Sequence, residues 1–204
     1  MLVLGLTGGI GMGKSTAAAT FRRARVPVFD ADAEVHRLQA RGGRAVPAIA
    51  AAFPGTVADG VVDRARLRRA VIGDRAALSR LEAILHPLVR DAQRRFIAAA
   101  RRRGAALVVL DIPLLFETGG RRRVDRVVVV SAPPAVQRHR VRLRGKMDDA
   151  QISAIIGRQM PDREKRRLAD YVVQTGLSRH HAQRAVRRLV RRLTRQGRES
   201  GERE

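Results

Sequence analysis

Near its start the chain reads Gly8-Gly9-Ile10-Gly11-Met12-Gly13-Lys14-Ser15, which fits the pattern G-x-x-x-x-G-K-[ST] of a phosphate-binding loop. A short apolar run at 2–6 precedes this stretch and a segment of helical composition at 15–25 follows it, which is the context that the motif requires. Glycines allow the backbone to curl so that successive N–H groups face one phosphate, and the positive end of the following helix faces the same anion. The stretch therefore predicts a P-loop protein that binds a nucleoside triphosphate.

Two side chains of the loop add specific chemistry. Lys14 would place a positive charge against the β and γ phosphates, and Ser15 would offer its hydroxyl to Mg²⁺. Thr16 either adds a phosphate contact or is only a residue of the first helical turn. The predicted ATP-binding residues of this stretch are Gly9, Ile10, Gly11, Met12, Gly13, Lys14, Ser15 and Thr16. The loop alone does not separate a kinase from a GTPase or a motor.

Strand-like and helix-like segments alternate along the rest of the chain. Further strand candidates lie at 26–29, 105–112, 126–131 and 171–174. Their valines and leucines run continuously rather than alternating with polar residues, which indicates strands buried on both faces. The alternation predicts an α/β fold with a five-stranded parallel sheet covered on both faces. Together with the two insertions and the resemblance described below, it predicts a three-layer P-loop kinase fold. A last amphipathic helix is expected from Ser178, with a frayed tail from Gln196.

Two stretches interrupt this alternation. Residues 33–103 hold no clear strand but carry helical patterns, and Pro87 is expected in the first turn of one helix with His86 just outside it. Residues 140–165 are rich in arginine and hold one helix around Ile152. We expect a single domain over 1–204: a core at about 1–32, 104–139 and 166–204, a helical acceptor-binding insertion at about 33–103 and a lid at about 140–165.

Two absences narrow the class of protein. A Ras-type GTPase carries an N-K-x-D motif that reads the base, and this sequence has none. ATP-driven motors usually exceed a length of 204 residues. A small P-loop protein with two helical insertions is typical of the relatives of nucleotide kinases, in which one insertion holds the acceptor and the other closes as a lid.

The composition bears on partners and location. A net charge of +23 favours a nucleic-acid partner, so a P-loop nucleic-acid-binding or regulatory protein is the alternative of a different class. The excess arginine is spread over every segment and aromatic residues make up only 3%, so we expect no specific nucleic-acid partner. The chain has no cysteine and no segment that reads as a signal peptide or a membrane span. We expect a cytoplasmic monomer or small homo-oligomer without a membrane partner.

Five motifs in a fixed order make a resemblance to a known family specific. They are the opening 5–15, Asp30-Ala31-Asp32, Leu85-His86-Pro87, the stretch from Asp111 to Glu117, and Pro133 to Gln137 with Arg140 to Arg144, followed by Gln159, Lys165 and Ala169-Asp170-Tyr171. With these motifs the chain resembles the dephospho-coenzyme A kinases, up to about Gly176. The family catalyses the last step of coenzyme A synthesis, and another small-molecule or nucleoside-monophosphate kinase is the nearer alternative.

The resemblance implies a reaction and roles for individual residues. ATP with Mg²⁺ would phosphorylate the ribose 3′-hydroxyl of dephospho-coenzyme A. The implied catalytic residues are Asp32, Lys14 and Arg140; Arg144 would join the ATP site; Asp32, His86 and Leu114 would bind the acceptor; Ser15 would hold Mg²⁺ directly and Asp111 through water. Asp32 also lies just past the carboxyl end of a predicted strand, where ligands gather in open α/β sheets.

Several of these residues have an ordinary structural alternative. Asp32 either orients the acceptor hydroxyl or caps the next helix, and Asp30 is at least as well explained by capping. Asp111 is either close to the metal or an ordinary aspartate at the end of a strand. For Glu117 we expect an ion pair, and His86 either contacts the acceptor or caps the helix expected at Pro87.

The chain departs from the family pattern at three places. Met12 stands where serine is commoner, and we expect little effect because backbone N–H groups act there. Gly145 replaces a common acidic residue beside the expected lid. Gln174-Thr175 stands where asparagine usually precedes Gly176, which bears on contacts with the adenine base.

Overall fold

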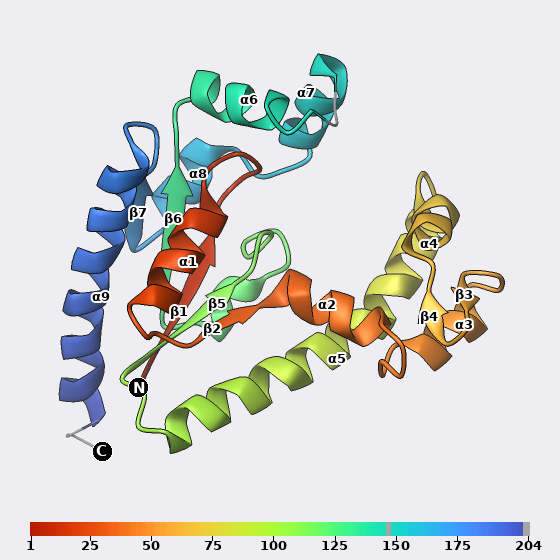
Figure 1. Ribbon diagram of the computed structural model, residues 1–204, viewed down its shortest axis with the longest axis horizontal. Helices are drawn as coiled ribbons and strands as arrows, with labels where there is room; N and C mark the ends of the chain where they lie inside the picture. The colour runs from red at the N-terminus through yellow and green to blue at the C-terminus, as the bar shows by residue number, and fades with distance from the viewer. Residues whose placement is uncertain (146–147, 202–204) are drawn as a thin grey trace. The chain divides into compact units, whose positions relative to one another are not determined.

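The computed structural model describes residues 1–145 and 148–201 (Figure 1). The chain forms two compact units, one made of Met1–Phe29 and the chain from Ala99 onward, the other made of Asp30–Ala98. The second unit covers nearly the same residues as the helical insertion expected at 33–103. No helix among the described residues combines the length and the apolar character that a membrane span requires.

A five-stranded parallel sheet forms the centre of the first unit, in the order β2-β5-β1-β6-β7. The strands are β1 Leu2–Thr7, β2 Val28–Asp30, β5 Leu107–Asp111, β6 Arg126–Ser131 and β7 Tyr171–Gln174. β1 lies between β5 and β6, with Leu4 opposite Val109 on one side and Arg126 on the other. The expected α/β fold is confirmed, and every predicted strand is present with ends that differ by no more than two residues.

Two helices cover one face of the sheet. They are α1 (Lys14–Arg23) and α9 (Arg179–Gly201), which pack on each other beside the sheet in Figure 1. Phe21 of α1 and Leu193 of α9 are fully buried and share one apolar cluster with Leu4 of β1. Burial of this kind contributes roughly 1.5–3 kcal/mol for each large apolar side chain, so the cluster fixes α1, and with it the loop that precedes α1, on the sheet.

Irregular chain and a short helix cover the other side. A methyl group added to Gly5 of β1 would lie 2.9 Å from Leu115 and 3.3 Å from Val124, so the connection between β5 and β6 packs directly on the sheet. This connection includes the 3-10 helix Gly120–Arg123. The helix α8 (Asp162–Leu168) packs beside β6. The sheet therefore lies between two covering layers, as the three-layer fold requires.

The segment between β6 and β7 holds α8 and two further helices. They are α6 (Pro134–Arg142) and α7 (Asp149–Gly157). The helix expected around Ile152 is α7, and Ile152 is its buried residue. Its start is fixed by a capping box, in which the Asp148 side chain accepts from the Gln151 N–H and the Gln151 side chain accepts from the Asp148 N–H.

The C-terminal helix is longer than the sequence indicates. A frayed tail was expected from Gln196, and this expectation is wrong because α9 continues to Gly201. An ion pair of 2.9 Å joins Arg195 and Glu199 at helical i,i+4 spacing, which supports this last part of the helix. The remainder of the expected tail, 202–204, lies outside the described residues.

The second unit is built around its own core. In chain order it contains α2 Ala31–Gln39, α3 Val46–Ala52, β3 Val57–Ala58, β4 Val61–Val62, α4 Arg64–Val71 and most of α5 Arg75–Arg102. Ile49 and Leu81 are two of its buried apolar residues. The β3–β4 hairpin corrects the expectation of no strand at 33–103. Strands of two residues are too short to show alternation, and the turn residues Asp59 and Gly60, both at positive φ, carry the only signal.

The long helix α5 corrects a second expectation. Pro87 was expected to begin a helix, but it lies inside α5, which runs without interruption from Arg75 to Arg102. Proline in a helix interior costs about 3 kcal/mol because it removes a hydrogen bond and clashes with the preceding turn. The apolar stripe of α5 continues across the proline, since Leu85 before it and Leu88 after it pack in the same cluster, and this packing outweighs the cost.

Candidate active site

The phosphate loop is shaped by backbone that only glycine adopts easily. Gly11 has φ 75° and Gly13 has φ 87°, both in the left-handed region. A methyl group on Gly11 would lie 2.8 Å from the carbonyl oxygen of Gln137, so helix α6 also leaves no room for a side chain there. Gly13 immediately precedes α1, whose first residue is Lys14. The loop therefore delivers the N-terminus of α1 to the carboxyl end of the sheet.

Lys14 and Asp111 meet at this end of the sheet. The Lys14 Nζ atom lies 2.8 Å from Asp111 Oδ1, and the two side chains are 18% and 5% exposed. Asp111 is the last residue of β5, and β5 is the direct neighbour of β1, which leads into the loop. The carboxylate is thus more than an isolated strand-end residue, because it holds the lysine ammonium at the mouth of the loop.

The oxygen groups near the loop suit a hard divalent cation. Ser15 carries an exposed hydroxyl in the first turn of α1, and Asp111 carries the carboxylate at the end of β5. Within the ranges that the structure describes, no three His, Asp or Glu side chains cluster as a metal cage. Mg²⁺ commonly takes one or two protein oxygens together with waters and substrate phosphates, and that pattern fits this donor set.

Arg140 and Thr175 fasten the second half of the loop to the sheet. Arg140 Nη2 donates to the Thr175 carbonyl at 2.6 Å, and Arg140 Nη1 donates to Thr175 Oγ1 at 3.1 Å. Thr175 Oγ1 in turn donates to the Met12 carbonyl at 2.7 Å and is buried. The threonine that departs from the family pattern therefore connects the end of β7 to the loop through its hydroxyl.

The Met12 side chain has a structural place of its own. It is 3% exposed in the cluster between the sheet and α1, and its Sδ atom accepts the Ala132 N–H at 3.1 Å. Serine at this position would leave much of that apolar volume unfilled. Substitution of Met12 should therefore affect packing behind the loop as well as the loop itself.

A pocket of about 370 Å³ opens beside the second half of the loop. It is lined by Gly11, Gly13, Ser15, Thr16, Arg140, Leu143, Arg144, Thr175, Arg179 and Ala182. Six of these were predicted as site residues. Leu143, Arg179 and Ala182 were missed, because the start of α9 meets α6 only in the folded chain. The departure at Thr175 was the signal in the sequence that pointed to this wall.

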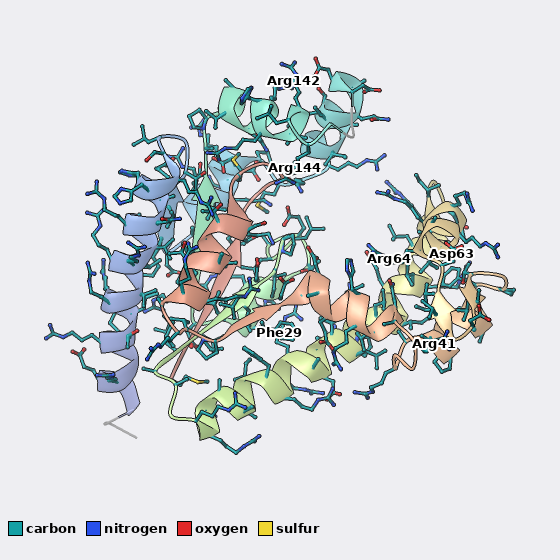
Figure 2. The ribbon with its side chains drawn as sticks, viewed as in Figure 1. Phe29, Arg41, Asp63, Arg64, Arg142 and Arg144 are labelled. Carbon is teal, nitrogen blue, oxygen red and sulfur yellow. The ribbon has the colours of Figure 1, made fainter. Side chains whose placement is uncertain are left out.

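Arg142 and Arg144 lie near the end of α6 but differ in what they contact (Figure 2). Arg142 makes two hydrogen bonds to Asp149, at 2.7 and 2.6 Å, and this contact holds the pKa of the Asp149 carboxyl below its ordinary value. Arg144 follows the helix and lines the pocket. Arg140 and Arg144 were both predicted as site residues, and both contribute to the same pocket.

Two glutamines hold the first half of the loop. Gln137 Nε2 of α6 donates to the Ile10 carbonyl at 2.9 Å, and the Ile10 N–H donates to Gln159 Oε1 at 3.1 Å. Gln137 is 7% exposed, and Gln159 lies in the turn that follows α7. Nothing in the local sequence pattern reveals these contacts, which join residues more than 120 positions apart.

A buried ion pair lies close behind this part of the loop. Lys165 of α8 is 1% exposed, and its Nζ lies 2.8 Å from Glu117 Oε1, which also accepts the Met160 N–H at 3.0 Å. Burial raises the pKa of Glu117, but the adjacent Lys165 ammonium and hydrogen bonds from backbone N–H groups outweigh burial and leave this pKa below its ordinary value. The expectation of an ion pair for Glu117 is confirmed, whereas its partner was not predicted.

The remaining candidates lie partly in the second unit. Asp30 caps α2 by accepting the Ala33 N–H at 3.0 Å, so the capping expected for Asp30 is confirmed and the alternative that Asp32 is the cap is wrong. Asp32 is exposed in the first turn of α2. His86 is exposed inside α5 and caps no helix, because α5 continues through it. Leu114, 41% exposed, belongs to the first unit and follows β5.

The comparison with protein families decides the family. The model of one family, described as dephospho-CoA kinase, matches residues 2–179. The chain belongs to the dephospho-CoA kinase family. The match covers the phosphate loop, the Lys14–Asp111 pair and every residue of the insertion at 33–103.

Known dephospho-CoA kinases are similar over most of the chain. The dephospho-CoA kinase of Mesorhizobium japonicum is 56% identical over 193 residues, which are 95% of this chain and 97% of the relative. That of Paramagnetospirillum magneticum is 61% identical over 166 residues, 81% of this chain and 78% of the relative. Among solved structures, TT1252 from Thermus thermophilus has 36% identity and a TM-score of 0.81, with 94% of this chain and 97% of that chain covered.

Proposed function

We propose that this chain transfers the γ-phosphoryl group of ATP to the ribose 3′-hydroxyl of dephospho-coenzyme A, giving coenzyme A and ADP. Membership of the dephospho-CoA kinase family over residues 2–179 supports the choice of acceptor. The observation that carries the chemistry is the Lys14–Asp111 pair at the mouth of a complete phosphate loop, because it holds a positive charge where a terminal phosphate would lie.

The nucleotide is proposed to lie along the loop with its base end in the 370 Å³ pocket. Backbone N–H groups of Gly11, Gly13, Lys14 and Ser15, the last two in the first turn of α1, then face its phosphates. Lys14 leaves Asp111 or bridges it to the phosphate, and Arg140 and Arg144 neutralise phosphate charge from the α6 side. Such charges accelerate transfer because they are already in place when negative charge moves to the leaving oxygen.

Mg²⁺ would be held by the Ser15 hydroxyl and, through water, by the Asp111 carboxylate. When bound, it would neutralise charge on the β and γ phosphates and orient them. The residues proposed here supply oxygen donors only, which is the preference of this ion.

Asp32 is proposed as the residue that acts on the acceptor. Its exposed carboxylate would accept a hydrogen bond from the ribose 3′-hydroxyl and take its proton as the oxygen–phosphorus bond forms. In a loose transition state proton removal comes late, so orientation of the hydroxyl is the larger part of this role. His86 and Leu114 are proposed to contact other parts of the acceptor, and the reaction is proposed to take place in the cytoplasm.

Acceptor selectivity tests the proposal. Purified protein is incubated with ATP, Mg²⁺ and a panel of acceptors that includes dephospho-coenzyme A, nucleoside monophosphates, shikimate and gluconate, and ADP release is measured for each. Of the acceptors in the panel, we expect only dephospho-coenzyme A to give rapid ADP release, with one ADP formed for each acceptor phosphorylated. The variant Lys14→Ala should release no ADP with any acceptor. Faster turnover of another acceptor would replace the proposed substrate, and ADP release that needs no acceptor would indicate an ATPase.

A further inference from the structure

The residues Gly9 to Met12 form a tight turn within the phosphate loop. The Met12 N–H donates to the Gly9 carbonyl at 3.1 Å, which is the hydrogen bond that closes a four-residue turn. Ile10 and Gly11 are its two central residues, and Gly11 has φ 75°. A positive φ at the second central residue is the property that distinguishes a type II turn from a type I turn.

Types I and II differ mainly in the direction of one peptide group. The central peptide joins Ile10 to Gly11, and its carbonyl points to opposite faces of the turn in the two types. The reason is that types I and II differ in ψ of the first central residue and φ of the second. Glycine at the second central position makes both directions sterically accessible. The loop residues alone therefore leave open which way the Ile10 carbonyl and the Gly11 N–H point.

Gln137 makes this choice in the folded chain. Its Nε2 donates to the Ile10 carbonyl at 2.9 Å, and only the observed direction of the peptide presents that carbonyl to α6. In a trans peptide the C=O and the N–H point in opposite directions. The Gly11 N–H is therefore directed away from the Gln137 amide, and Gly11 is one of the residues that line the pocket.

Gln159 supports the same arrangement from the neighbouring peptide. It accepts the Ile10 N–H at 3.1 Å, so both polar groups of Ile10 are engaged by glutamine side chains and neither is free for a phosphate. Gln137 is 7% exposed, which leaves its amide little access to competing water. The N–H groups of Ile10 and Met12 both donate within the protein, whereas that of Gly11 can face the nucleotide.

We propose that Gln137 is a positioning residue that fixes the Ile10–Gly11 peptide in its type II direction and so aims the Gly11 N–H at a phosphate of the bound nucleotide. The inference rests on the proposed function, because it assigns the nucleotide to this loop. The Gln137 side chain donates to a backbone carbonyl of the loop, so its proposed effect on the reaction passes through Gly11.

Replacement of Gln137 by glutamate gives the sharpest test. The side chain keeps its size, but a carboxylate oxygen now faces the Ile10 carbonyl oxygen and repels it. A flipped peptide relieves this repulsion by turning the Gly11 N–H to the carboxylate. Loss of one pre-aimed backbone donor typically lowers kcat by about 10²-fold, so we expect about that loss in Gln137→Glu, with a smaller change in the KM for the acceptor. Gln137→Leu, which removes the hydrogen bond without repulsion, should lose about 10-fold.

The Gly11 amide resonance in ¹⁵N-labelled protein reports the mechanism itself. On addition of ADP we expect a large shift of this resonance in the wild type, a small one in Gln137→Glu, and a wild-type response in the control Arg138→Leu on the next position of α6. Arg138 contacts Ser153 rather than the loop. Should the glutamate variant fail to fold, Gln137→Leu carries the same comparison.

The outcomes separate the inference from the proposed function. Wild-type kcat and an unchanged Gly11 response in both Gln137 variants would overturn the inference while phosphoryl transfer stands. A Gly11 response in the wild type that Gln137→Glu abolishes would support the inference even if no acceptor is phosphorylated, and then only the proposed function would fall. A wild-type Gly11 resonance that ignores ADP would overturn the inference directly.

Discussion

Removal of the Lys165 charge should destabilise the first unit strongly. Lys165 is 1% exposed and its Nζ lies 2.8 Å from Glu117 Oε1, whose side chain is 21% exposed. At this distance and an effective dielectric constant of 20 the attraction is about 6 kcal/mol, but desolvation of the two charges costs several kcal/mol for each ion. The whole pair therefore contributes little net stability, whereas the loss of one partner leaves a charge without compensation.

The variant Lys165→Met measures this difference. Loss of one member of a buried pair costs about 3–5 kcal/mol, and because Glu117 keeps some exposure and the Met160 N–H, we expect the lower end, about 3 kcal/mol. The double variant Glu117→Gln/Lys165→Met, which leaves no buried charge, should recover more than half of that loss. Urea unfolding followed by circular dichroism gives the free energy of unfolding for each protein.

A surface pair of the same type supplies the control. Arg195 and Glu199 are 2.9 Å apart on α9, and their side chains are 84% and 55% exposed. Arg195→Met should cost less than about 0.5 kcal/mol, because an exposed pair gains little in water. A loss below about 1 kcal/mol in Lys165→Met, or a double variant less stable than the single one, would refute the reasoning about burial.

Three further predictions concern the site and its surroundings. Asp32→Asn should lower kcat by about 10²–10⁴-fold with little change in the acceptor KM, while the exposed control Asp59→Asn should match the wild type in the same steady-state assay. Gly11→Ala should be about 1–3 kcal/mol less stable to urea than Gly104→Ala, since both have positive φ but only Gly11 lacks room for a methyl group. Folding lowers the pKa of Glu117, so its ionised carboxylate stabilises the folded protein above the unfolded pKa of about 4.5, and this stabilisation is lost as the pH falls through the folded pKa. Urea unfolding at a series of pH values should therefore show the difference in stability between wild type and Glu117→Gln shrinking as the pH falls below about 4.5.

The sheet and the phosphate loop could be predicted because their signals are local. The strands at 126–131 and 171–174 have the predicted bounds. A continuous run of buried valines marks β6 as an inner strand of a parallel sheet, whereas β7 is an edge strand in which Val173 is buried and Val172 is exposed. The loop was recognised because its chemistry depends on residue types at a fixed spacing. Lys14 and Asp111 were both chosen from sequence, although their direct pairing became visible only in the folded chain.

Errors arose where packing outweighs a local preference. Proline usually marks the start of a helix, yet the apolar stripe that contains Leu85 and Leu88 keeps α5 continuous through Pro87. Leu78 of the same helix is 44% exposed, whereas its smaller neighbour Ala77 is buried. The size of an apolar residue is a poor guide to its burial when either of two adjacent residues can occupy the buried face of the helix.

The contacts that hold the loop were beyond sequence reasoning for a different reason. Gln137, Gln159 and Lys165 are polar residues in helices or turns, and such residues usually face solvent. The roles of the two glutamines depend on the Ile10 backbone, which the fold brings to them across more than 120 residues of chain. The role of Lys165 depends on the Glu117 carboxylate, which another segment supplies. The family resemblance marked these positions as motif residues, but it did not indicate what their side chains contact.

The most direct measurement is phosphorus NMR of the product formed from ATP and dephospho-coenzyme A. Wild-type protein should generate one new phosphomonoester resonance, coupled to the ribose 3′ proton, in equal amount to ADP, and Lys14→Ala should generate none. A phosphoryl group on another oxygen, or inorganic phosphate released with the acceptor unchanged, would contradict the assignment of this chain as a 3′-hydroxyl kinase.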